Sequence, residues 1–381
     1  MAKVESDSFD DLNLNQDLLK GVYLYGFNQP SKIQIKGISS INTGKDCILQ
    51  SQSGTGKTAT YLLGVMNRLE ENKTLQGIVI APTRELAEQI YSVAMSLSEH
   101  TKFKIVKCTG GTSVYQTIQD MKGANMIIGT MGRINHMIED NKINSHGIKF
   151  IVMDEADELF VKGITRDMYS IFDKLPSGIQ VVFISATMNS TVFDASKKFA
   201  HDPIKVLLKQ SEVVVDLISQ FYIDIEKEDL KFDTLLDLYN LISASQAIIF
   251  CNTIKKVQWL EENLKKNNFP ITSMHSDMDQ AQRDATVKEF RDGKTRLLLT
   301  TDILARGIDI PQVNMVINYD LPPTKETYIH RIGRCGRFDK KGVAITMIKS
   351  LDQSDVKTFH KMKNFYRIKI DEMPEDIKPY L

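Results

Sequence analysis

Short apolar runs alternate with segments of helical periodicity along the whole chain. In the first half, strand-like runs occur at residues 47–49, 77–81, 103–106, 126–128, 150–153 and 181–184. A second series occurs at 221–225, 247–250, 271–274, 297–300, 315–317 and 343–348. Buried strands that alternate with helices are typical of parallel sheets with helices on both faces. We therefore expect an α/β protein whose second half repeats the architecture of its first half.

A polar stretch at 209–216 interrupts this alternation. The chain has 381 residues, which suits two domains better than one. We predict a first domain over 1–208, a linker over 209–218 and a second domain over 219–381.

Composition limits the classes of protein that fit. Lys plus Arg and Asp plus Glu both number 48, so the formal net charge is zero and any nucleic-acid binding must come from a local surface. The four cysteines lie far apart, which disfavours a zinc ribbon or a disulfide framework. The polar, acidic start and the lack of an apolar run of about 18 residues favour a soluble, cytoplasmic protein without membrane contact.

A glycine-containing loop follows the first apolar run. The sequence S-Q-S-G-T-G-K-T, which starts at Ser51, places Gly54 and Gly56 in this loop and begins a helical segment at Lys57. Glycines let backbone N–H groups turn toward phosphate oxygens, and a helix N-terminus adds partial positive charge. Lys57 can reach the β- and γ-phosphates, and Thr58 can bind Mg²⁺. Although a solvated Gly/Ser turn is the alternative, we predict a nucleoside triphosphate site.

Two carboxylates follow the apolar run 150–153. Asp154 and Glu155 stand at the predicted carboxyl end of a parallel strand, where α/β sheets bind ligands. Asp154 can hold Mg²⁺ through water, and Glu155 can orient an attacking water. An acidic helix N-terminus is the alternative. The phosphate loop in the same chain favours the metal site.

Three arginines, Arg331, Arg334 and Arg337, are regularly spaced in a segment that contains glycine. Arginines cannot be buried unpaired, and no carboxylate run nearby in the sequence would neutralise these three. We therefore expect them to bind an anion, with a solvated basic patch as the alternative.

The ordered motifs of the chain resemble those of the DEAD-box RNA helicases. They are S-G-T-G-K-T from Ser53, D-E-A-D from Asp154, S-A-T from Ser185 and H-R-I-G-R-C-G-R from His330, together with G-F-N-Q-P-S-K-I-Q, P-T-R-E-L-A, T-G-G and T-D-I-L-A-R-G-I-D. They occur in the family's order over nearly the whole chain. The resemblance implies two tandem RecA-like domains, each a mostly parallel sheet with helices on both faces, and RNA-stimulated hydrolysis of ATP to ADP and phosphate.

The resemblance also implies roles for the residues that match the family's ATP motifs. Gln34 would bind the adenine edge, Phe27 or Phe9 would pack on the adenine ring, and Asp309 would contact the ribose. Without the resemblance, the sequence indicates only that Phe27 is a core residue. The implied nucleotide set is Phe9, Phe27, Gln34, Ser53, Gly54, Thr55, Gly56, Lys57, Thr58 and Asp309, with Mg²⁺ at Thr58 and Asp154.

The implied catalytic residues are Lys57, Glu155, Arg334 and Arg337. By resemblance, the two arginines act as fingers on the γ-phosphate when the domains close, an effect of about 10³–10⁵ in rate. Ser185 and Thr187 would form hydrogen bonds with Asp157. Without the resemblance, Ser-Ala-Thr at the end of a strand indicates only a helix cap. The set that would couple the nucleotide state to RNA is Asp157, Ser185, Thr187, His330 and Arg331.

The RNA contacts implied by the resemblance bind phosphates and 2′-hydroxyls without reading sequence. They are Thr83, Arg84, Gly110, Gly111, Thr130, Arg133, Gln280, Arg283, Thr301 and Arg306.

Three residues depart from the family's pattern: Met131 replaces a proline, and Ser276 and Asp339 replace glycines. Met131 frees a backbone N–H, so we expect a looser turn beside Thr130 and Arg133.

The resemblance extends to family members that act in translation initiation, through N-Y-D-L-P from Asn318 and E-M-P-E-D-I from Glu372. It implies a monomer outside complexes, a large scaffold partner of the cap-binding complex and accessory factors that promote closure. The alternative function is an ATP-locked RNA clamp of the exon-junction or ribosome-biogenesis type, which could be nuclear. A DNA helicase or a transport ATPase is disfavoured, because the chain has neither accessory domains nor net positive charge.

Overall fold

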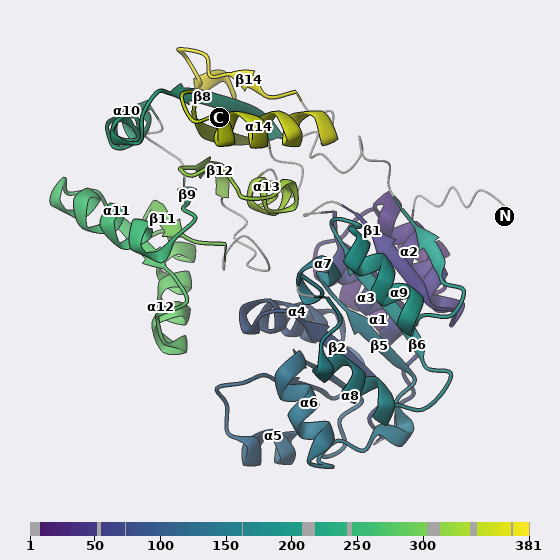
Figure 1. Ribbon diagram of the computed structural model, residues 1–381. Coiled ribbons are helices and arrows are strands. Elements are labelled where there is room, and N and C mark those ends of the chain that lie inside the picture. Colours follow the sequence, from purple (N-terminus) through teal and green to yellow (C-terminus); the bar gives the residue numbers. More distant parts are fainter. Residues whose placement is uncertain are drawn as a thin grey trace. The chain divides into compact units, whose positions relative to one another are not determined.

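The computed structural model describes residues 8–51, 55–72, 74–161, 163–207, 218–241, 246–302, 313–335, 341–366 and 369–380, in two compact units (Figure 1). Met1–Ser51 and Thr55–Leu208 belong to the first unit, and Lys209–Leu381 to the second. Of the predicted linker, only Ile218 lies within the described residues, where it begins a strand.

The first unit is built on a seven-stranded sheet in the order β3-β4-β2-β5-β6-β1-β7. Every described strand pairing in it is parallel. The strands are β1 (Cys47–Gln50), β2 (Gly77–Ala81), β3 (Ile105–Cys108), β4 (Met126–Thr130), β5 (Phe150–Met153), β6 (Gln180–Ser185) and β7 (Ile204–Val206). The helices are η1 (Phe9–Leu12), α1 (Gln16–Leu24), α2 (Lys32–Asn42), α3 (Lys57–Met66), α4 (Arg84–Leu97), α5 (Val114–Asp120), α6 (Met131–Glu139), η2 (Ser145–Gly147), α7 (Ala156–Leu159), α8 (Arg166–Lys174) and α9 (Ser190–Phe199).

Successive apolar residues of the central strands in this sheet enter different hydrophobic clusters. Leu49 of β1 packs in one cluster with residues of α1 to α4, whereas the preceding Ile48 packs in another with residues of α6 to α9. Successive side chains of a strand point to opposite faces of its sheet. Because both faces of the sheet are apolar and each is covered by helices, the central strands consist of consecutive apolar residues.

The second unit repeats this plan, with a sheet in the order β10-β11-β9-β12-β13-β8-β14. Its described pairings are also parallel. The strands are β8 (Ile218–Ile225), β9 (Gln246–Phe250), β10 (Ile271–Met274), β11 (Leu297–Thr300), β12 (Val313–Asn318), β13 (Gly342–Lys349) and β14 (Asp371–Glu372). The helices are η4 (Glu228–Leu230), α10 (Lys231–Leu241), α11 (Ile254–Lys266), α12 (Gln280–Arg291), α13 (Lys325–Ile332), α14 (Gln353–Tyr366) and η5 (Lys378–Tyr380).

The expected fold class is confirmed, since both halves are parallel sheets with helices. Two details differ from the prediction. The strand expected at 103–106 is displaced to Ile105–Cys108, and the sheets are extended by β7 and β14, which the apolar pattern did not indicate.

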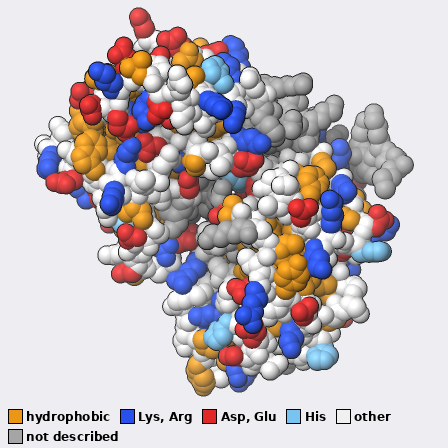
Figure 2. All heavy atoms as spheres, in the orientation of Figure 1, with side chains coloured by type: hydrophobic (Ala, Val, Ile, Leu, Met, Phe, Trp, Pro, Cys, Tyr) orange, Lys and Arg blue, Asp and Glu red, His pale blue; other side chains and the backbone are white. Residues whose placement is uncertain are grey.

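The distribution of surface charge and the state of the cysteines agree with the expectations from composition. Lys, Arg, Asp and Glu side chains are interspersed over the face shown in Figure 2. All four cysteines are buried free thiols. In the described part of the chain, none of the helices combines the length and the apolar character needed to cross a membrane.

Candidate nucleotide and nucleic-acid site

The candidate phosphate, metal and coupling residues of the first unit lie at the carboxyl ends of its parallel strands. The phosphate loop follows β1, the two carboxylates follow β5, and Ser185 ends β6. These three strands are neighbours in the order β5-β6-β1. The same strand order therefore explains why motifs that lie far apart in the sequence come together at one edge of the sheet.

The phosphate loop is described at both of its ends, while Ser53 and Gly54 lie outside the described residues. Gly56 has a φ of 86° and precedes the first residue of α3. Ser51, which replaces the usual first glycine, has its hydroxyl 2.7 Å from the hydroxyl of Thr55. The left-handed backbone at Gly56 favours glycine, which has no Cβ to clash.

Lys57 is a buried cation whose ammonium group lacks a hydrogen-bond partner in the described part of the chain. Its side chain is 8% exposed, and Nζ finds no hydrogen-bond partner among the residues that the structure describes. The nearest carboxylate oxygen, Oε1 of Glu155, is 3.9 Å away. A buried ammonium normally has hydrogen-bonded partners, so this position is suited to an anionic ligand such as a phosphate.

Gln34 is tied to the phosphate loop through a capping box. Its Oε1 accepts a 2.7 Å hydrogen bond from the backbone N of Ser31, whose hydroxyl donates to the carbonyl of Thr55 at 2.9 Å. A Cβ added at Gly56 would lie 2.7 Å from Nε2 of Gln34. The amide of Gln34 therefore lies directly beside the loop. Its acceptor oxygen already has one partner but keeps a second lone pair for a base.

The two phenylalanines proposed for the adenine ring differ in exposure. Phe9 is 0% exposed and belongs to the hydrophobic core, so it has no free face for a base to pack on. Phe27 is only partly buried, with its ring centroid 6.0 Å from that of Phe9. The proposal for Phe9 is therefore corrected to a core role behind Phe27, which remains the candidate.

The two carboxylates after β5 are buried but differently held. Oδ1 of Asp154 accepts from the backbone N of Glu155, and Oδ2 accepts from the hydroxyl of Tyr61, both at 2.9 Å. Burial, and then repulsion from Glu155, raise the pKa of Asp154 to about 7, while the charge of Lys57 opposes the shift. A cation at this position would offset both effects.

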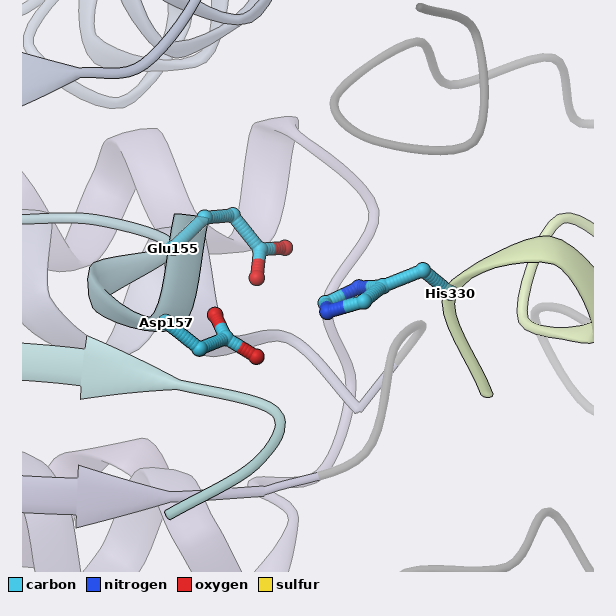
Figure 3. A group of neighbouring side chains, drawn as sticks. All are labelled: Glu155, Asp157 and His330. Atoms are coloured by element: carbon cyan, nitrogen blue, oxygen red, sulfur yellow. The ribbon is translucent and has the colours of Figure 1, made fainter. Parts of the chain in front are cut away.

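Glu155 adopts a left-handed backbone conformation, with a φ of 47°, immediately before α7. Non-glycine residues are uncommon in this region and tend to occur at functional sites. Figure 3 shows that the Glu155 and Asp157 carboxylates project in the same direction from the start of this helix. Glu155 is only 6% exposed.

The expected contact between the D-E-A-D and S-A-T segments is made by Thr187. Its hydroxyl donates a short hydrogen bond to Oδ2 of Asp157. The hydroxyl of Ser185 instead donates to the carbonyl of Thr187 at 2.6 Å and accepts from its amide. Ser185 thus orders the turn that presents Thr187 to Asp157.

The RNA candidates of the first unit follow the other strand ends, in the order β3-β4-β2. The guanidinium of Arg84 lies against the glycine pair: a Cβ at Gly110 would be 2.8 Å from its Nη2, and one at Gly111 would be 2.6 Å from its Nη1. Thr83 caps α4 by accepting from the N of Leu86. A side chain at either glycine would displace Arg84. The two glycines therefore allow backbone amides and a guanidinium to lie together, and both are groups that bind phosphates.

Arg133 and Thr130 lie at the start of the neighbouring helix α6. Nη2 of Arg133 donates to the carbonyl of Thr112 at 3.1 Å. The hydroxyl of Thr130 makes no cap bond with the helix. Met131, expected to loosen this turn, is instead the first residue of α6, and the hydroxyl of Thr165 lies 3.3 Å from its sulfur. A proline at the first helical position would fit the same backbone, so the helix accommodates either residue.

In the second unit, three RNA candidates follow the adjacent strands β10 and β11. Nη2 of Arg283 donates to Oε1 of Gln280 at 2.8 Å on the first turn of α12, and Thr301 follows β11. Arg306 and the proposed ribose contact Asp309 lie outside the described residues, as does Asp339. Ser276 is exposed before α12.

The expectation that Arg331 needs an external anion is wrong. Arg331 is 0% exposed, and its Nε donates to Oδ1 of Asp302 at 2.6 Å. The two terminal nitrogens donate to the carbonyl of Asp320 and to Oδ1 of Asn252. Its neutralising carboxylate lies 29 residues upstream, so sequence proximity could not reveal it.

The other residues of this motif are only partly described. Arg334 is 4% exposed and its Nε donates to the carbonyl of His330, which itself is buried in α13. Arg337 lies outside the described residues. The proposal of arginine fingers therefore concerns Arg334 and Arg337, while Arg331 is a structural residue of the second unit.

Comparison with protein families agrees with this arrangement of sites. A model described as DEAD/DEAH box helicase matches residues 31–195, and one described as helicase conserved C-terminal domain matches residues 230–339. Together with a relative that is 47% identical over 97% of the chain, these matches show that the protein belongs to the DEAD/DEAH box helicases. Within that family, it is similar to eukaryotic initiation factor 4A.

Two relatives and one solved structure illustrate this similarity. Eukaryotic initiation factor 4A of Caenorhabditis elegans is 47% identical over 373 residues, covering 97% of this chain and 92% of the relative. ATP-dependent RNA helicase eIF4A of Pyricularia oryzae is 47% identical over 373 residues, covering 97% of this chain and 93% of the relative. The structure of S. cerevisiae Dbp5 bound to RNA and ADP BeF3 has a TM-score of 0.90 and 35% identity, covering 98% of this chain and 97% of that chain.

Proposed function

We propose that the chain couples ATP binding and hydrolysis in its first unit to the binding and release of one RNA strand, and so separates short RNA duplexes. By family, it is an ATP-dependent RNA helicase, an enzyme that hydrolyses ATP. The observation that carries the proposal is Lys57, a buried ammonium at a helix N-terminus whose Nζ finds no hydrogen-bond partner among the described residues.

On the nucleotide side, each residue has a distinct task. Gln34 would bind the adenine edge and Phe27 would cover its ring. Lys57 would bind the β- and γ-phosphates as a point charge. Glu155 would orient the attacking water and accept its proton, a task suited to a carboxylate that points away from its own helix backbone.

The residues present fit a Mg²⁺ ion. The hydroxyl of Thr58 and the carboxylate of Asp154 are oxygen ligands of the kind that Mg²⁺ prefers, with waters completing its shell. The raised pKa of Asp154 marks a buried carboxylate that lacks sufficient positive charge nearby. When bound, the ion neutralises charge on the phosphates; Thr58 and Asp154 would hold it there.

On the RNA side, the glycine pair, Arg84, Thr130 and Arg133 at the ends of β2, β3 and β4 would form one set of phosphate contacts. Gln280, Arg283, Thr301 and Arg306 would extend this set on the second unit. Such contacts position a strand without selecting its bases, which suits an enzyme that acts on many RNAs.

Hydrolysis would depend on the second unit through Arg334 and Arg337. With ATP and RNA bound, these arginines would reach the γ-phosphate and stabilise its charge in the transition state. Thr187 and Asp157 would transmit the nucleotide state to the RNA contacts. Release of phosphate would then reset the cycle.

We further propose that the cellular role is in cytoplasmic translation initiation. The support is the similarity, over nearly all of both chains, to proteins named initiation factor 4A. A scaffold and accessory factors of initiation would be the partners.

The test is an ATPase assay with single-stranded RNA, with single-stranded DNA of matching sequence and without nucleic acid. We expect RNA alone to stimulate turnover at saturating ATP. Turnover that is unchanged by RNA would refute the coupling, and equal stimulation by DNA would refute the RNA preference. A complex with RNA that persists for minutes in ATP would instead favour the clamp function.

A further inference from the structure

Tyr61 contacts one of the two proposed Mg²⁺ ligands and lies on the same helix as the other. It lies in α3, one turn after Thr58, and is 0% exposed. Its hydroxyl donates to Oδ2 of Asp154 at 2.9 Å. A phenol on the helix that carries Thr58 therefore contacts the carboxylate that follows β5.

This contact completes the fixation of the Asp154 carboxylate. The backbone N of Glu155 holds Oδ1, and Tyr61 holds Oδ2, each at 2.9 Å. A carboxylate oxygen has two lone pairs, so each oxygen keeps one for a further partner. With one bond at each oxygen, the carboxylate cannot rotate without breaking one of them.

A buried tyrosine needs a hydrogen-bond partner in any protein, so the bond alone does not establish a role. Phenylalanine would fill the same space without burying a hydroxyl, and α3 is otherwise apolar around Leu62 and Leu63. The partner of this hydroxyl is also a carboxylate that is 3% exposed, rather than a backbone carbonyl. A positioning role and a merely structural role therefore predict different metal dependence.

We propose that Tyr61 is a positioning residue that holds the Asp154 carboxylate in the orientation for Mg²⁺ in the nucleotide complex. The inference rests on the Mg²⁺ site of the proposed function. Groups that orient a metal ligand typically change metal affinity by about 10–100-fold when they are removed. For one neutral donor, we expect the lower end of this range.

The test compares Tyr61→Phe with the wild-type chain and with Tyr328→Phe. Tyr328 is a matched control, because it is another fully buried tyrosine whose hydroxyl donates to a side-chain oxygen, Oε1 of Gln220, also at 2.9 Å. It belongs to the second unit. The measurement is equilibrium binding of a non-hydrolysable fluorescent ATP analogue over a series of Mg²⁺ concentrations.

We expect Tyr61→Phe to raise the half-saturating Mg²⁺ concentration about 10-fold, with analogue affinity in EDTA unchanged. Tyr328→Phe should leave both quantities as in the wild type, although both variants lose one buried hydrogen bond. An unchanged or lower Mg²⁺ requirement in Tyr61→Phe would overturn the inference. If instead the wild-type chain binds the analogue independently of Mg²⁺, the proposed metal site itself fails.

A double-mutant cycle guards against a general loss of structure. In an Asp154→Asn background, Tyr61→Phe should change the Mg²⁺ requirement by less than about two-fold, because the carboxylate it positions is gone. If the two substitutions have independent, multiplicative effects, Tyr61 acts through something other than Asp154 and the inference is wrong.

Discussion

Replacing Glu155 by glutamine removes one buried negative charge while it preserves the shape of the side chain. Glu155 is 6% exposed and lies beside Lys57, which we propose binds the phosphates. An amide cannot accept a proton from the attacking water. General-base catalysis typically contributes about 10²–10⁴ in rate, so we expect turnover to fall by that factor, or roughly 3–5 kcal/mol of barrier.

Unlike turnover, ATP affinity should not fall in Glu155→Gln. Oε1 of Glu155 lies 3.9 Å from Nζ of Lys57. At an effective dielectric constant of about 20, their attraction is roughly 4 kcal/mol, most of which is offset by the cost of burying both charges. Since Lys57 would have to share its charge between this carboxylate and the phosphates, glutamine frees it for ATP. We therefore expect affinity to be unchanged or tighter.

The assay combines single-turnover hydrolysis, with enzyme and RNA in excess, and equilibrium titration of a fluorescent ATP analogue. Glu158→Gln is the matched control, because it makes the same substitution three residues later, inside the short helix that Glu155 precedes, and it should hydrolyse ATP normally. Parallel loss of binding and turnover in Glu155→Gln would mean that Glu155 positions the nucleotide. Normal turnover would exclude it as the base.

Three further predictions concern stability and coupling. Arg331→Met should lower the free energy of unfolding by about 3 kcal/mol in denaturant titrations, because it removes the hydrogen bonds that a fully buried guanidinium donates to Asp302, Asn252 and the carbonyl of Asp320; a loss below about 1 kcal/mol would contradict its structural role. Thr187→Val removes the bond to Asp157 and should reduce duplex separation per ATP hydrolysed several-fold while RNA-stimulated hydrolysis persists, which paired unwinding and ATPase assays would check. Burial raises the pKa of Asp154 to about 7, so the native state keeps this proton to higher pH than the unfolded chain does. The resulting stabilisation is full below about pH 4 and is lost as pH rises through about 7, so unfolding measured without Mg²⁺ should show declining stability across that window, and Asp154→Asn should flatten the decline.

The sequence predicts the central strands well and the sheet edges poorly. Central strands are buried on both faces and give continuous apolar runs. The edge strands β7 and β14 have only three and two residues, too few for a pattern. At β3, the lysine in the strand, Lys107, reaches Glu88 at the surface, so the apolar run ends before the strand does.

The sequence indicates a candidate site residue where a local motif carries the chemistry. It does not indicate the role of a residue whose environment is set by contacts with distant parts of the chain. Lys57 and Asp154 follow from a loop and a strand end. Phe9 and Arg331 could not be assigned correctly, because only the fold shows that one is in the core and that the other is neutralised by a distant carboxylate. Tyr61 belongs to no motif, although its helical spacing of three residues from Thr58 is a signal that could have indicated it.

The most direct measurement is RNA-stimulated ATP hydrolysis by the full-length Arg334→Ala variant, with ATP affinity determined in parallel. If an arginine of the second unit completes the surroundings of ATP held by the first, stimulation should fall about 10³-fold or more while ATP affinity without RNA stays as in the wild type. If Arg334→Ala hydrolyses ATP at the wild-type, RNA-stimulated rate, hydrolysis does not depend on this residue of the second unit.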